Sequence, residues 1–175
     1  MARLRPADST GEVADRVRQR RHGVLTPLDR VLLHSEPLAD GWNTLLGAVR
    51  SQFQLPDELR ELAILRVAVL NGADYEWQAH EPLLRQAGFS EDQVAALHEG
   101  ADTSALSRVH QACLAYTDAM TRDVTVPDDV FAEVLGHLGE RQTVELTATI
   151  ATYNLVSRFL VAMEIGAADG EGTPA

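Results

Sequence analysis

The stretch that most constrains the fold covers residues 61–88, with the sequence ELAILRVAVLNGADYEWQAHEPLLRQAG. Between residues 62 and 70 the only charged side chain is Arg66. A helix that is apolar on every side has to be surrounded by protein. The Asn71-Gly72 pair is a typical helix end. The stretch therefore predicts two helices joined by a tight turn, with the first in the middle of a helical bundle or at a subunit interface.

The rest of the chain also carries helical spacing. Apolar side chains recur at intervals of three and four residues, which is typical of an amphipathic helix, at Leu106, Val109, Cys113, Tyr116 and Met120. Prolines and glycines lie between the periodic segments, and Gly139 is placed to end one helix before the last begins. We find no strand pattern. The predicted fold is all-α, a compact multi-helix bundle with a central antiparallel helical hairpin over residues 56–88.

A length of 175 residues favours one domain. We predict a flexible N-terminal arm over residues 1–22, in which residues 11–20 form a short helix. A single all-helical domain is predicted over residues 23–167. The Gly- and acid-rich tail, residues 168–175, is predicted to be disordered.

The composition excludes several classes of function. A net charge of -11 argues against nucleic acid as the main partner, because phosphate binding needs a basic face. The single cysteine, Cys113, excludes an intrachain disulfide, and its apolar helix face predicts a buried, inert thiol. No signal peptide is evident, and no run of about 18 apolar residues suggests a membrane span. We therefore expect a cytoplasmic protein with no membrane partner.

Charged side chains at the ends of the two central helices point to a functional site. Glu76 and His80 lie one turn apart, at the top of an apolar stripe that continues through Leu83 and Ala87. Glu61 heads the apolar face of the preceding helix. In an antiparallel hairpin the second helix brings His80 back toward Glu61, with Glu76 further from Glu61.

Two carboxylates and an imidazole in an apolar pocket are suited to general acid–base catalysis, since burial and neighbouring charges tune such groups. Tyr75 and Trp77 would supply a hydrogen bond and an aromatic wall. Three other interpretations stay open: a Glu–His pair that only satisfies itself, aromatic side chains that only pack, and a metal site. The chain has no HxxxH or HxH pair, so we predict no metal.

The same residues resemble the carboxymuconolactone decarboxylase family, which includes the alkylhydroperoxidase D-like proteins. The similarity covers roughly residues 28–165. It is carried by RELAILR at residues 60–66, GADYEWQAH at 72–80 and AGFS at 87–90, with looser agreement from Glu145 to Val156. The chain looks like a subgroup with a YEWxxH motif that lacks the CxxC pair. The resemblance implies an all-helical fold that assembles into homotrimers or homohexamers.

The resemblance also bears on the chemistry. Peroxidase-type members combine a Glu on the first helix with a CxxC pair and a following His, and Glu61 and His80 match that Glu and that His. Ala73 and Glu76 stand at the two cysteine positions. The family's thiol peroxidase mechanism is therefore not available to this chain. The decarboxylase branch acts on a small carboxylated lactone without a cofactor.

From these observations we predict a cofactor-independent lyase or isomerase that acts on a small carboxylated or lactone substrate. Glu61 and His80 would transfer protons and Glu76 would be a second acid/base. Tyr75, Trp77 and Tyr153 would bind substrate. The alternatives are a non-catalytic helical assembly or binding protein, a peroxidase-related protein that has lost its thiol chemistry, and a metal-dependent enzyme.

Overall fold

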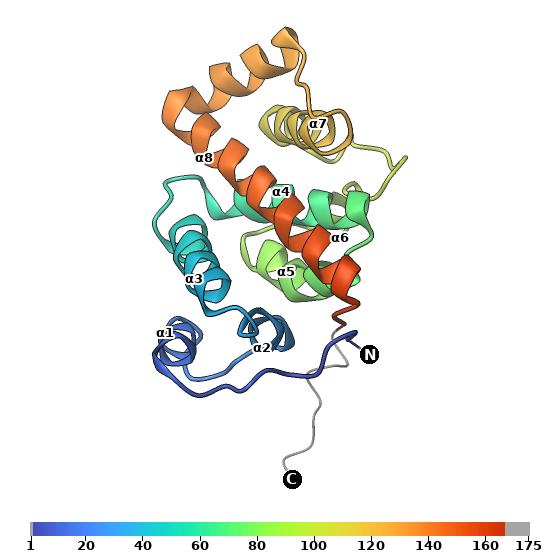
Figure 1. Cartoon of the computed structure of the whole chain (residues 1–175). Coiled ribbons are helices and arrows are strands. Elements are labelled where there is room, and N and C mark those ends of the chain that lie inside the picture. The colour runs from blue at the N-terminus through green and yellow to red at the C-terminus, as the bar shows by residue number, and fades with distance from the viewer. Residues whose placement is uncertain (1, 167–175) are drawn as a thin grey trace. The chain divides into compact units, whose positions relative to one another are not determined.

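A computed structural model describes residues 2–166, so the predicted tail at 168–175 lies outside the described residues. Over this range the structure contains helices and no strand (Figure 1). The predicted all-α fold is therefore confirmed. The helices are α1 (Glu12–Arg20), α2 (Pro27–Leu32), α3 (Glu36–Ser51), α4 (Asp57–Asn71), α5 (Asp74–Gln86), α6 (Glu91–Ala95), α7 (Arg108–Arg122) and α8 (Asp128–Met163).

The chain divides into two compact units. One holds Met1–Gln52 together with Leu160–Ala175, and the other is Phe53–Phe159. The predicted domain boundaries remain a prediction, although the short helix expected near residues 11–20 is present as α1.

In the first unit, α3 packs against α1 and α2. Helix α2 begins at a capping box, in which the Thr26 side chain accepts from the backbone N–H of Asp29 and the Asp29 carboxylate accepts from that of Thr26. Asp29 is buried, and Arg21 Nε lies 3.1 Å from its Oδ2. This carboxylate therefore links the end of α1 to the start of α2.

In the second unit, α4 and α5 form the predicted central hairpin. Two acidic residues, Asp57 and Glu58, occupy the first turn of α4, where they complement the helix dipole. The helix ends at Gly72, whose φ of 62° and ψ of 36° lie in the left-handed region that favours glycine. The chain then reverses directly into α5.

Helix α4 is buried nearly throughout. Every residue from 61 to 68 is buried within the single chain, and α4 packs against α5 and α7. This burial supports the interpretation of α4 as an interior helix, and no subunit interface is needed to explain its apolar sequence.

The one charge inside that apolar stretch is paired. The guanidinium of Arg66 donates to both carboxylate oxygens of Asp118 on α7, each at 2.6 Å, and to the carbonyl of Leu97 at 2.8 Å. A buried arginine is stable only with such partners. Arg66 therefore joins α4, α7 and the end of α6.

Helix α8 contains a break at the predicted stop. Gly139 has φ 70° and ψ 174°, which are not helical values, and Figure 1 shows the ribbon changing direction within α8. By length and composition alone, α8 is long and apolar enough to cross a membrane, although the sequence had suggested no membrane span. Half of its most apolar 18-residue window is buried inside the protein. Core helices of soluble proteins meet the same criterion.

Candidate functional site

The second unit brings Glu61 and His80 into direct contact. Nδ1 of His80 lies 2.6 Å from Oε2 of Glu61, a short hydrogen bond across the α4–α5 hairpin. The other Glu61 oxygen, Oε1, accepts from Nε of Arg60 at 3.1 Å. The contact between Glu61 and His80 that the sequence suggested is therefore present.

Glu76 approaches the opposite nitrogen of the same imidazole. Oε2 of Glu76 lies 3.4 Å from Nε2 of His80, one helical turn away on α5. This oxygen is buried and has no hydrogen-bond partner among the described residues. The sequence indicated only that Glu76 would be further from Glu61; the structure shows His80 between the two carboxylates.

Tyr153 completes the cluster from α8. Its hydroxyl lies 3.4 Å from Nε2 of His80, and the two rings meet edge to face with centroids 5.3 Å apart. The sequence predicted Tyr153 as a substrate-binding residue but gave no partner for its hydroxyl. The contact holds the imidazole in place between α4, α5 and α8.

The four side chains form what we call the relay cluster: Glu61, Glu76, His80 and Tyr153. Their exposed fractions are 3%, 2%, 3% and 0%. Charged groups interact strongly in such a water-poor environment. Burying carboxylates is costly unless their charges are paired, and Glu61 contacts both Arg60 at 3.1 Å and His80 at 2.6 Å.

Two of the three aromatic residues predicted to bind substrate, Tyr75 and Trp77, lie on the first turn of α5 and are half-buried. The indole of Trp77 packs against the imidazole of His98, with ring centroids 4.6 Å apart. Trp77 thus lines a separate pocket, described below, and the sequence gave no indication of His98 as its neighbour. Whether Tyr75, Trp77 and Tyr153 bind substrate stays a prediction.

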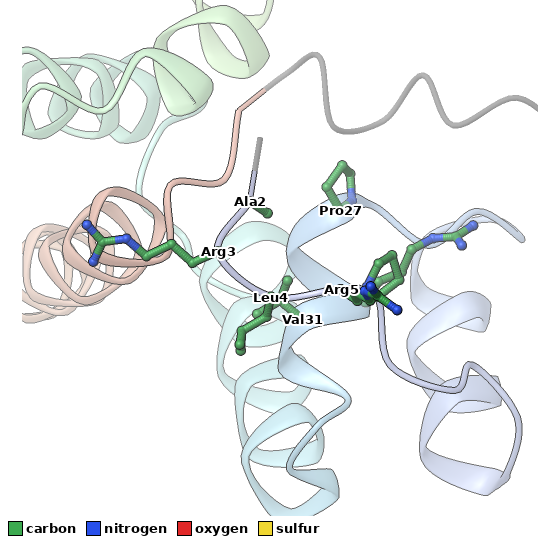
Figure 2. Close-up of a pocket in the computed structure, with 8 residues that line it drawn as sticks. Ala2, Arg3, Leu4, Arg5, Pro27 and Val31 are labelled. Atoms are coloured by element: carbon green, nitrogen blue, oxygen red, sulfur yellow. The ribbon is translucent and has the colours of Figure 1, made fainter.

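The described residues contain no evident metal-binding group, and the first unit contains a pocket of its own. Within residues 2–166 no group of three His, Cys, Asp or Glu side chains is arranged to hold a metal ion. A pocket of about 220 Å³ in the first unit lies between the N-terminal segment and α2 (Figure 2). One of its lining residues, Arg3, is paired with Glu164 at 2.8 Å.

Cys113 on α7 is expected to be unreactive in the folded protein. Burial raises the pKa of its thiol from 9.0 to about 12, so the thiolate is scarce at pH 8. A thiol-specific reagent should label native protein hardly at all at pH 8 and should label urea-unfolded protein fully. Rapid labelling of native protein would contradict the buried position of Cys113.

The same thiol makes stability depend on pH. Because only the unfolded thiol ionises between about pH 9 and 12, Cys113 lowers the free energy of unfolding as pH rises through that window.

Comparisons with known proteins agree with this architecture. The sequence profile of the carboxymuconolactone decarboxylase family matches residues 36–119. The uncharacterized protein YdfG of Bacillus subtilis (strain 168) is 30% identical over 106 residues, which are 59% of this chain and 72% of that protein.

Among solved structures, a variant of the debrominase Bmp8 in complex with 2,3,4-tribromopyrrole superposes with a TM-score of 0.75 at 18% identity, over 97% of this chain and 96% of that one. A peroxidase-related protein from Silicibacter gives 0.75 at 15% identity over 98% of each chain. An Agrobacterium tumefaciens protein of unknown function gives 0.70 at 22% identity, over 83% of this chain and 96% of that one. At these identities the structures establish the shared all-helical fold.

Proposed function

The chain belongs to the carboxymuconolactone decarboxylase family, and we propose that it is a cofactor-independent enzyme that moves protons on a small carboxylated or lactone substrate. The observation that carries the proposal is the buried imidazole of His80 between two carboxylates, 2.6 Å from Glu61 and 3.4 Å from Glu76. Titratable groups placed together in a protein interior are typical of acid–base sites.

The roles follow from the two imidazole nitrogens. Nδ1–H of His80 donates to Glu61, which leaves the lone pair of Nε2 as proton acceptor. Glu61 then stabilises the imidazolium that forms. Glu76, whose Oε2 faces Nε2, exchanges protons with it and restores the starting state. Tyr153 holds the ring from the same side as Glu76.

Two reaction types use this arrangement. In a decarboxylation Nε2 of His80 first takes a proton from the carboxyl group of Glu76. The bond to the carboxylate carbon of the substrate then breaks, carbon dioxide leaves, and the electron pair remains on the substrate as an enolate. The enolate takes the proton from Nε2, and Glu76 is reprotonated from water. In a proton-shift isomerisation Nε2 removes a proton from one carbon and returns it to another. Because the relay cluster is 0–3% exposed, substrate has to enter through a local opening.

A carboxylated substrate is supported by Arg60. Its guanidinium contacts Oε1 of Glu61 at 3.1 Å and Asp57 at 2.7 Å, and its side chain is 12% exposed. Arginine is well suited to carboxylate recognition because it offers five N–H donors in a planar fork. We propose that Arg60 receives the substrate carboxylate at the Glu61 end of the relay cluster.

The alternative of a purely structural helical protein explains the relay cluster less well. Among the described residues Glu76 Oε2 is buried with no hydrogen bond, and its 3.4 Å contact with Nε2 of His80 offsets only part of that cost. Assembly into trimers or hexamers and a cytoplasmic location belong to the same proposal and are tested separately, by sedimentation and by cell fractionation.

Replacing Glu61 with glutamine tests the proposal. The amide has the same shape as the carboxylate but cannot stabilise the imidazolium, so E61Q should lower turnover by about 10²–10⁴-fold, the usual range for acid–base groups. The measurement is carbon dioxide release, and deuterium incorporation in D₂O, across a panel of small carboxylated lactones.

The matched control is E58Q, which changes a half-buried carboxylate one turn earlier on α4, where it lies 3.8 Å from Nε2 of His110. It should keep wild-type turnover and the wild-type helical circular dichroism. If wild-type protein neither decarboxylates nor exchanges protons on any member of the panel, or if E61Q is as active as E58Q, the proposed function is wrong.

A further inference from the structure

A second site lies at the turn between α4 and α5. The structure has a pocket of about 250 Å³ there, within the second unit. Its lining comes from the end of α4, the start of α5 and the loop after α6, namely Ala68, Val69, Gly72, Ala73, Asp74, Trp77 and His98. Glu61, Glu76 and His80 are not among these residues, so the pocket is distinct from the relay cluster.

One wall of this pocket is aromatic. The indole of Trp77 and the imidazole of His98 lie 4.6 Å apart at 36°, which makes a continuous π surface from two separate elements. Of the other lining residues, Ala68 and Ala73 are buried and Val69 is half-buried. An apolar lining with a few polar groups is the usual composition of a small-molecule site.

The charge of the pocket is negative. Asp74 is exposed, and its carboxylate makes no hydrogen bond or ion pair with any of residues 2–166. No lysine or arginine is among the lining residues, and His98 is the one other titratable side chain among them. Aromatic faces attract cations through their quadrupole, most strongly the indole of tryptophan. The Asp74 carboxylate and the Trp77 indole therefore both favour a positively charged ligand.

We propose that this pocket binds a small organic ammonium cation, with the ammonium between the Asp74 carboxylate and the indole face of Trp77. The apolar part of the ligand lies against Val69 and Ala73. His98 bounds the pocket beside Trp77, since its ring packs against the indole with centroids 4.6 Å apart. This site does not depend on the proposed acid–base function.

Tryptophan fluorescence gives a direct measurement, because the chain has two tryptophans and Trp42 is 4% exposed in the other unit. In a W42F background, Trp77 is the only indole. The probes are benzylamine, benzyl alcohol and phenylacetate, which have similar size and are cationic, neutral and anionic at pH 7. We expect benzylamine to change the fluorescence saturably, with at least tenfold weaker binding of the other two.

Three variants locate the ligand. D74N should weaken benzylamine binding about tenfold, which corresponds to about 1.4 kcal/mol, and should leave benzyl alcohol unchanged. V69F should fill the pocket and abolish binding. D92N is the matched control, since Asp92 is an exposed acid in the first turn of neighbouring α6, and it should bind as the parent does.

The result that overturns the proposal is no saturable change with benzylamine, equal binding of all three probes, or a D74N protein that binds benzylamine like D92N. Circular dichroism of each variant shows whether a loss of binding comes from unfolding. The H80A variant separates the two proposals: it should bind benzylamine normally while its turnover is lost.

Discussion

An H80A protein should lose at least about 10³-fold in turnover, because the imidazole contacts both buried carboxylates and acid–base groups commonly contribute 10²–10⁴-fold. The loss should lie in kcat rather than in KM, since His80 transfers the proton and substrate binding is assigned to other residues. The measurement is steady-state kinetics on whichever small carboxylated lactone the wild-type protein converts.

Chemical rescue makes this prediction specific to proton transfer. Removing the ring leaves a space next to Glu61, and added imidazole should enter it and restore part of the activity. H80Q keeps a hydrogen-bonding side chain of similar length but no titratable group, so it should fold and remain inactive. H137A, which removes an exposed histidine of α8, should behave as wild type. An active H80Q enzyme would contradict the role given to His80.

Local sequence rules were sufficient to predict the helices. Proline and acidic residues at the start of α4, Gly72 at its end and Gly139 within α8 each act through backbone geometry that depends on a few neighbouring residues. The sequence left open whether α4 was interior or at a subunit interface, because hydrophobicity reports burial without identifying what buries the helix.

The site was predicted only in part. Helical periodicity brought Glu61 and His80 together, since both lie on the facing sides of one hairpin. It did not show that Tyr153 reaches Nε2 of His80, because that contact depends on how α8 packs, 73 residues later in the chain. Periodicity also gave no signal for the contact of Arg60 with Glu61, because neighbouring side chains on a helix usually point apart.

The largest effect on stability is expected at the buried ion pair of Arg66 and Asp118. Arg66 is 5% exposed, whereas the Asp118 side chain is 27% exposed. D118A leaves a guanidinium buried with only the Leu97 carbonyl, so it should lower the free energy of unfolding by about 3–5 kcal/mol, as for other broken buried pairs. R66M leaves a carboxylate that water partly reaches, and it should cost less.

The double variant separates attraction from desolvation. Methionine at position 66 can pack among the apolar neighbours of α4, and with alanine at position 118 no buried charge remains, so R66M/D118A should be more stable than D118A alone. Urea unfolding with a common m value measures all three proteins. Arg122 is on the same helix as Asp118, α7, and forms an exposed pair with Glu99 in the loop after α6. R122M, which breaks this exposed pair, should leave the urea midpoint unchanged. If the double variant is instead less stable than D118A, Arg66 stabilises the fold mainly through its bond to Leu97, and the Asp118 contact is secondary.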